Sequence, residues 1–236
     1  MMDLRNQVCI VTGASRGIGQ AAARALAQEG AQVVLAARSR ESLQRLQDEL
    51  GERCIAIPCD VRSESSVGEM VAGAARQMGR IDILVNAAGL GHQVSVEETS
   101  LDLWNETLET NLRGTFLVCR EALPHLGKRG GQIVNIASGA GYNGIAGMAA
   151  YCASKFGVVG FTESLALEVR NRNIRVCCVA PGSVKTHFGH EPPEKKKGYS
   201  LLAEEVAGVI VSVLRQPLQA WMSEVIVRPL NLKVER

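Results

Sequence analysis

The chain has 236 residues, 46% of them hydrophobic, and a formal net charge of +2. This length and composition predict one sizeable domain with a well-buried core, and the small charge gives no support for a nucleic-acid partner. No stretch approaches the roughly 18 apolar residues of a membrane span, and the first residues lack the apolar core of a signal peptide. We therefore expect a cytoplasmic protein with no membrane partner.

Seven cysteines are scattered through apolar patterns, without a C-x-x-C pair or histidines at ligand spacing. We interpret them as buried packing residues of a reducing compartment and expect no metal site. Cys152 adjoins Tyr151, but packing is the favoured interpretation for it too.

Apolar runs alternate with helical patterns along the chain. Strands are predicted at 7–12, 32–37, 54–59, 82–86, 131–137, 174–180 and 223–228, and helices at 17–29, 40–50, 64–79, 103–128, 151–171 and 203–216. This alternation predicts βαβ units with right-handed crossovers, and the continuous apolar strands indicate a sheet covered on both faces. The prediction is a single-domain α/β fold over 1–236, a three-layer doubly wound parallel sheet of the Rossmann type.

A glycine-rich turn, Thr12 to Gly19 (TGASRGIG), joins the first strand to the first helix. Such a turn lets the backbone approach a pyrophosphate, whose charge the helix N-terminus favours. The spacing G-x-x-x-G-x-G differs from the common dinucleotide fingerprint, and tight turns also need glycine for backbone reasons alone. The position between strand and helix favours a nucleotide site.

The end of the second predicted strand indicates which dinucleotide binds. An acidic residue there accepts bonds from the ribose hydroxyls of NAD, whereas this strand ends in Ala37-Arg38-Ser39. Arg38 and Arg16 of the turn would bind a 2′-phosphate through charge-assisted forked bonds. The alternative is two exposed arginines at helix starts. We predict NADP(H) as the cofactor.

Three candidate catalytic residues lie in the second half of the chain. Ser138 comes directly after the apolar run 132–137, at the carboxyl end of a predicted strand, where open α/β sheets bind their ligands. Tyr151 and Lys155, four residues apart, lie on one face of a helix. A tyrosine hydroxyl titrates near pH ~10, and an adjacent ammonium would lower that pKa by favouring the phenolate. A helical Tyr–Lys pair also arises by chance on surfaces, so the interpretation depends on the other motifs.

Together these motifs resemble the short-chain dehydrogenase/reductase family. Besides the glycine turn, Ser138 and the Tyr–Lys pair, the chain has Cys59-Asp60-Val61, Asn86-Ala87-Ala88-Gly89, Asn111, Pro181-Gly182 and Thr186. These motifs occur in the family's order and spacing over most of the chain. Each is weak alone, and together they are a strong signal.

The resemblance implies a cofactor role for each matching residue. Asp60 would bond the adenine edge, Ile18 and Val184 would pack near the nicotinamide, and Thr186 would bond its carboxamide. The residues expected to bind the cofactor are Gly13, Ser15, Arg16, Gly17, Ile18, Gly19, Arg38, Ser39, Asp60, Val61, Asn86, Ala87, Ala88, Gly89, Tyr151, Lys155, Pro181, Gly182, Val184 and Thr186.

The same resemblance implies NADPH-dependent reduction of a ketone or aldehyde. Ser138 would hydrogen-bond the substrate oxygen, Tyr151 would be the general acid, and Lys155 would hold the nicotinamide ribose. Asn111 would be a water-mediated link in proton supply to Lys155; the alternatives are a helix-kinking or interface residue. A non-catalytic NADP-binding sensor is the lesser alternative, because all four catalytic positions are intact.

The substrate pocket is expected at Leu90 to Gln93, Gly139 to Asn143, Gly182-Ser183 and a flap at 187–200 that the resemblance implies. The residues expected to line the pocket, including His187 and Phe188 of the flap, carry no fixed charge that would demand an anionic substrate. The alternative function is a 3-oxoacyl-[acyl-carrier-protein] reductase, with Arg129 and Arg172 either docking an acidic carrier or acting as ordinary solvated charge. The C-terminal segment lacks the glycines usual in fatty-acid reductases of this type.

The helices predicted at 103–128 and 151–171 carry apolar residues on more than one face, including Phe116, Val118, Phe161 and Leu165. In similar proteins these helices pack against their counterparts in a second subunit. We therefore expect a homodimer, and a homotetramer through a second interface near 221–229.

Overall fold

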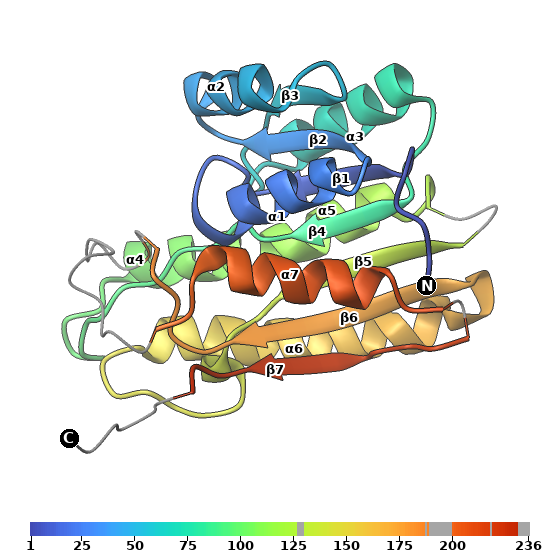
Figure 1. The fold of residues 1–236 in the computed structure, drawn as a ribbon. Helices are drawn as coiled ribbons and strands as arrows, with labels where there is room; N and C mark the ends of the chain where they lie inside the picture. Colours follow the sequence, from blue (N-terminus) through green and yellow to red (C-terminus); the bar gives the residue numbers. More distant parts are fainter. Residues whose placement is uncertain (127–129, 187, 189–199, 218, 231–236) are drawn as a thin grey trace, which may run out of the picture.

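The computed structural model of the chain describes residues 1–126, 130–186, 188, 200–217 and 219–230. Seven strands form one sheet in the order β3-β2-β1-β4-β5-β6-β7, and every neighbouring pair is parallel (Figure 1). The strands are β1 (Val8–Thr12), β2 (Gln32–Ala37), β3 (Cys54–Pro58), β4 (Ile83–Asn86), β5 (Gly131–Ile136), β6 (Ile174–Pro181) and β7 (Glu224–Val227). The predicted fold class is confirmed, and each strand lies where the apolar runs placed it. The chain reverses its direction of winding between β1 and β4, the point where open sheets of this kind bind ligands.

Helices cover both faces of the sheet (Figure 1). They are α1 (Gly17–Gln28), α2 (Arg40–Leu50), α3 (Glu64–Met78), α4 (Leu101–Leu108), α5 (Gly114–Ala122), α6 (Ala149–Val169) and α7 (Ala203–Leu214). Helices α1, α2 and α7 pack on one face, and α3, α5 and α6 pack on the other. The result is a three-layer arrangement with a core on each side of the sheet.

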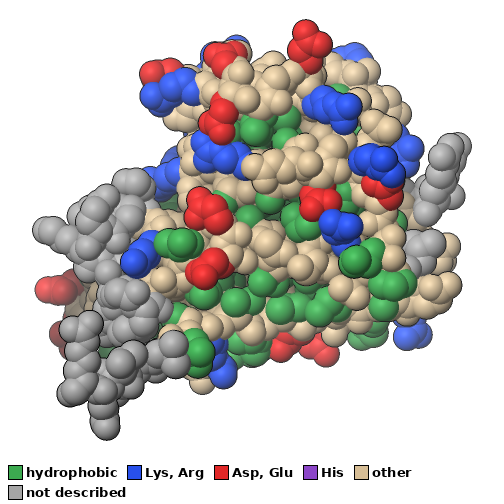
Figure 2. Space-filling view, viewed as in Figure 1, with side chains coloured by type: hydrophobic (Ala, Val, Ile, Leu, Met, Phe, Trp, Pro, Cys, Tyr) green, Lys and Arg blue, Asp and Glu red, His purple; other side chains and the backbone are tan. Residues whose placement is uncertain are grey.

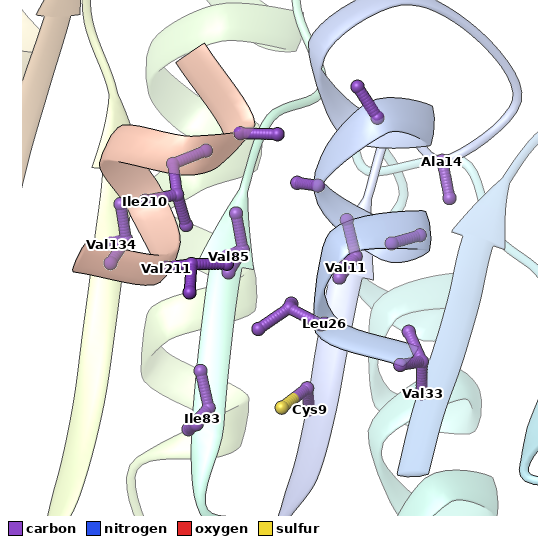
Figure 3. Close-up of a cluster of buried hydrophobic side chains, with 14 of the residues drawn as sticks. Cys9, Val11, Ala14, Leu26, Val33, Ile83, Val85, Val134, Ile210 and Val211 are labelled. Carbon is purple, nitrogen blue, oxygen red and sulfur yellow. The ribbon is translucent and has the colours of Figure 1, made fainter. Parts of the chain in front are cut away.

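Each strand contributes side chains to both cores. In β1, Cys9 and Val11 belong to the core under α1 and α7, whereas Val8 and Ile10 belong to the opposite one. Figure 3 shows the first of these cores, with Leu26 of α1 and Ile210 of α7 lying over the strands. Successive residues of a strand point to opposite faces, so a strand that is covered twice has no polar face. This explains the continuous apolar runs in the sequence.

The prediction of one regular helix over 103–128 is wrong. The structure has α4, then a π-helical turn at Glu109–Arg113, then α5, which ends at Ala122. A π-turn closes its hydrogen bonds from i to i+5 and so holds one residue more than an α-turn. Asn111 lies within this turn and is completely buried.

The cysteine prediction is confirmed for packing: all seven are free and buried. No described helix has both the length and the hydropathy that crossing a membrane requires. Among the described residues, no cluster of three or more histidine, cysteine and acidic side chains could hold a metal ion.

Two of the four apolar residues expected to face a partner lie in the core instead. Val118 and Leu165 pack with the sheet, whereas Phe116 is 41% exposed. The sequence analysis missed two other exposed residues on α6, Phe156 and Leu167. Hydrophobic side chains also gather over α7 and β7 in the lower part of Figure 2, and the β7 region includes exposed Trp221, Met222 and Ile226.

Candidate active site

A cavity of about 950 Å³ lies at the carboxyl ends of the strands. This volume suits a ligand larger than a typical small molecule. Most of the expected site residues line it: Gly13, Ser15, Arg16, Gly17, Ile18, Arg38, Ser39, Asp60, Val61, Ala87, Ala88, Gly89, Ser138, Tyr151, Lys155, Pro181, Gly182, Val184 and Thr186. Three do not: Gly19, Asn86 and Asn111.

The glycine turn forms one wall of the cavity. Gly13 has φ +69°, and a Cβ there would lie 2.8 Å from the Cα of Ala88, so only glycine allows this close approach. The hydroxyl of Thr12 accepts hydrogen bonds from the N–H groups of Ala87 and Ala88, at 3.2 and 3.3 Å. These contacts hold the turn against the segment after β4.

Helix α1 begins beside this turn without a side-chain cap and without an acidic residue in its first turn. Its backbone N–H groups and its dipole can therefore bind an anion such as a pyrophosphate. Gly19 is buried behind the turn, where a Cβ would lie 2.4 Å from the carbonyl oxygen of Gly13. The residue thus shapes the site without lining it.

Asn86 points away from the cavity. Its amide nitrogen donates to Asn135 Oδ1 at 2.9 Å and contacts the sulfur of Cys119, between the sheet and α5. Because the Asn86 side chain is buried, it does not reach a cofactor in the cavity directly in this geometry. Its role is to anchor the end of β4, from which Ala87 to Gly89 reach the cavity.

One end of the cavity carries the charged residues. Arg16 and Arg38 are exposed, line the cavity, and form no ion pair with any residue that the structure describes. Asp60 also lines it, but Arg62 binds its carboxylate, with Nε donating at 3.0 Å and Nη2 at 2.7 Å. The sequence analysis missed Arg62, although its position two residues after Asp60 permits such a contact.

The serine, tyrosine and lysine converge at the other end. Ser138 directly follows the segment that extends β5, and its hydroxyl accepts a bond from the N–H of Ala140 at 3.2 Å. Tyr151 is 8% exposed and Lys155 is 5% exposed on α6. The Lys155 ammonium lies 5.8 Å from the centroid of the tyrosine ring and donates to the carbonyl of Ile136 at 2.8 Å.

Contrary to expectation, Lys155 does not bring the pKa of Tyr151 below its ordinary value in this geometry. Burial raises the pKa of Tyr151 to about 12, and a hydrogen bond with Ser138 offsets only part of that effect. Burial also lowers the pKa of Lys155 to about 8. Desolvation disfavours both charged forms, so Tyr151 keeps its proton at neutral pH, as a proton donor must.

Asn111 organises the backbone beside the lysine. Its amide accepts from the N–H of Leu90 and donates to the carbonyl of Leu90, both at 2.8 Å. It also donates to the hydroxyl of Ser154 at 2.9 Å. The expected water-mediated link to Lys155 stays a prediction. Ser154 was missed, because a serine on a helix gives no signal of its own.

The substrate end is more apolar than expected. Leu90, Gly139, Ala140, Gly182, Ser183 and Phe188 line it as predicted. The other predicted residues of these segments that the structure describes do not: Gly91, His92, Gln93, Gly141, Tyr142 and Asn143. Ile145 and Met148, which were missed, complete this wall. The ring of Phe188 packs 5.1 Å from that of Tyr151. His187 and residues 189–199 of the expected flap lie outside the described residues.

Only one of the two arginines considered for carrier docking lies among the described residues. Arg172 donates to the carbonyl of Leu123 at 2.6 Å, so its guanidinium caps the chain after α5. Arg129 lies outside the described residues.

The chain is similar to known dehydrogenases and reductases. A family model described as short chain dehydrogenase matches residues 7–197. The chain is 38% identical to the 3-oxoacyl-[acyl-carrier-protein] reductase of Rattus norvegicus over 90% of this chain and 92% of that protein. It is also 41% identical to carbonyl reductase family member 4 of Danio rerio over 77% of each protein.

A solved structure extends the similarity to the whole fold. The alcohol dehydrogenase of Thermococcus sibiricus, complexed with 5-hydroxy-NADP, has a TM-score of 0.91 and 30% identity, covering 98% of this chain and 100% of that one. The similarity therefore extends over nearly all of both chains.

Proposed function

Because this chain belongs to the short-chain dehydrogenase family, we propose that it is an NADPH-dependent carbonyl reductase acting as one catalytic domain over 1–236. The observation that carries the proposal is a single cavity with unpaired arginines at one end and the Ser138, Tyr151 and Lys155 group at the other. The 5-hydroxy-NADP bound in the Thermococcus sibiricus structure supports the cofactor.

The described residues fit a dinucleotide phosphate. Arg16 and Arg38 would hold the 2′-phosphate, the N-terminus of α1 would face the pyrophosphate, and Lys155 would donate to the nicotinamide ribose. When bound, the cofactor supplies the hydride. The protein's part is to orient the carbonyl and to supply the proton.

Ser138 would donate a hydrogen bond to the carbonyl oxygen and fix its position. Tyr151 would give its proton to that oxygen as negative charge develops. Burial raises the pKa of this hydroxyl to about 12, so it is protonated at neutral pH but is a weaker acid, and the transfer needs a group that stabilises the phenolate. The ammonium of Lys155 would stabilise the phenolate that results.

The test is oxidation of NADPH in the presence of ketones, aldehydes, quinones and 3-oxoacyl thioesters. Turnover with at least one free ketone or aldehyde is expected. Tight NADPH binding without turnover across the whole panel would contradict the proposal and favour a cofactor sensor.

A second candidate is the reduction of 3-oxoacyl groups on an acyl carrier protein, favoured by the similarity to the rat enzyme. Because the Arg172 guanidinium donates to a backbone carbonyl, it is less available to dock a carrier protein. Comparison of one 3-oxoacyl group on a carrier protein and on a short thiol decides between the two. A large preference in kcat/KM for the carrier form would favour the second candidate.

We also infer a cytoplasmic homo-oligomer. Phe116, Phe156 and Leu167 leave an apolar surface over α5 and α6, which a second subunit would cover. Exposed Trp221 and Met222 beside the edge strand β7 would form the second contact of a tetramer. Light scattering at micromolar concentration tests this inference. A mass near the 25.3 kDa of one chain would contradict it.

A further inference from the structure

The carboxylate of Asp60 lies at the charged end of the cavity. Strands β2 and β3 are paired neighbours, and the N–H of Cys59 donates to the carbonyl of Ala37 at 2.9 Å. The residues after this bond, Arg38 and Asp60, therefore leave the sheet side by side. Asp60 is the one acid among the described residues that line the cavity.

An uncompensated acid at this place would oppose the proposed cofactor. Asp60 is expected at the adenine edge, and a carboxylate near the adenosine repels the 2′-phosphate of NADPH but not the uncharged hydroxyl of NADH. Arg38 is close enough for its charge to contribute to the lowered pKa of Asp60, after the larger contribution of Arg62. The carboxyl is therefore ionised at neutral pH, in the region where Arg38 would bind the phosphate.

Arg62 compensates this charge through a well-formed pair. Its Nε and Nη2 atoms donate to both carboxylate oxygens, and its backbone N–H donates to Oδ1 at 3.0 Å. A two-pronged pair of this kind fixes direction as well as charge. The guanidinium is also held from its other side by Glu106, at 3.5 Å.

We infer that Arg62 is a positioning residue for cofactor selection, which neutralises and orients Asp60 so that the cavity accepts a 2′-phosphate. Although Arg62 also lines the cavity, the inferred action is through Asp60 and not through contact with the phosphate. The inference rests on the proposed use of NADPH, and it assigns the selectivity to three arginines instead of two.

The test compares four variants with the wild-type protein in calorimetric titrations of NADPH and NADH. Arg62→Gln is expected to weaken NADPH binding about tenfold and NADH binding less than twofold, because it uncovers one charge near a phosphate. The difference is expected to shrink at about 1 M salt, where the Debye length is ~3 Å. Arg62→Lys, which keeps the charge, is expected to lose less of the preference.

The decisive variant is the double change Arg62→Gln with Asp60→Asn. If Arg62 acts through Asp60, removal of both charges restores most of the NADPH preference. If the double variant shows the same reduced NADPH preference as Arg62→Gln alone, Arg62 contacts the cofactor directly and the inference is wrong. Equal losses for NADPH and NADH in Arg62→Gln would also overturn it.

Glu106→Gln is the matched control, because it removes the other partner of Arg62 and leaves the pair with Asp60 in place. Its cofactor preference is expected to equal that of the wild type. Circular dichroism and thermal unfolding of each variant separate a loss of fold from a loss of selectivity. A preference of the wild-type protein for NADH would contradict the proposed function. The comparison of the double variant with Arg62→Gln tests the role of Arg62 independently of that result.

Discussion

The two ends of the cavity are built on different physical principles. The cofactor end consists of short turns at the carboxyl ends of β1, β2 and β3 and carries charged side chains, of which Asp60 and Arg62 are held to each other by hydrogen bonds. The substrate end is lined by apolar side chains from loops, such as Ile145, Met148 and Phe188. Charge with fixed geometry discriminates strongly between ligands, whereas an apolar wall discriminates weakly by size. We therefore expect a strict choice of cofactor and a broad choice of substrate.

Tyr151→Phe tests the junction between the two ends and has the largest expected effect. Turnover should fall at least a hundredfold because the proton donor is lost, while NADPH binding changes little. Stopped-flow and binding measurements give both values. Tyr142→Phe is the control, since that hydroxyl contacts Cys178 outside the cavity and its loss should leave turnover largely unchanged. A Tyr151→Phe variant with a tenth of wild-type kcat would exclude the assigned role.

Arg38→Asp should reverse the charge at the cofactor end. Repulsion in place of attraction is expected to move the ratio of kcat/KM for NADPH over NADH by about a hundredfold towards NADH. Kinetics with both cofactors measure the ratio. Arg40→Asp makes the same change two residues later, on an exposed side chain outside the cavity, and should have little effect. Equal shifts of this ratio in both variants would show that the cofactor preference depends on the overall charge of the protein and not on the position of Arg38.

The pH profile of the reduction tests Lys155. Its pKa is lowered to about 8 by burial, so the ammonium is charged below that pH and is lost as the pH rises through it. We expect kcat/KM to fall about tenfold for each pH unit above that value. A profile that stays flat to a pH well above 8 would show that the charge of Lys155 is not required.

Substitutions at the substrate end are expected to have the smallest effect on the kinetics. Ile145→Ser or Met148→Ser removes apolar contact worth ~0.8 kcal/mol per buried methylene, so KM for an apolar ketone is expected to rise several-fold. The dissociation constant of NADPH should stay unchanged. Steady-state kinetics with one apolar and one polar ketone measure the effect, and a change in NADPH affinity would contradict the division of the cavity into two ends.

The sequence predicted the parts of this molecule that depend on neighbours in the chain. Strand positions come from local apolar runs, and the glycine turn, Ser138, Tyr151 and Lys155 lie in short motifs. The direction in which a side chain points depends on tertiary packing. Asn86 turns away from the cavity because Asn135 and Cys119 lie behind β4, and nothing within β4 itself signals this.

The pKa values of Tyr151 and Lys155 show the same limit. Their i, i+4 spacing predicted proximity, but both are buried far more than a helix surface suggests. Desolvation then outweighs the effect of one on the other. Burial is a property of the assembled layers, so a pattern along one helix cannot supply it. Ile145 and Met148 were missed because the loop between Ser138 and Tyr151 has no periodicity from which to predict its path.

The π-turn at Glu109–Arg113 makes the length of this segment as important as its composition. Each residue added to a helix rotates the subsequent residues by about 100°, so deletion of one residue would restore a regular α-helix and change the phase of α4 against α5. Helix α5 is fixed by its buried residues, whereas α4 buries only Thr107. The deletion would therefore rotate α4 and disrupt the contact between Asn111 and Leu90. Deletion of Glu109 is therefore expected to lose more activity than Glu109→Ala, as turnover of the two folded variants would measure. We therefore expect this segment to tolerate a change of side chain at Glu109 but not a change in its number of residues.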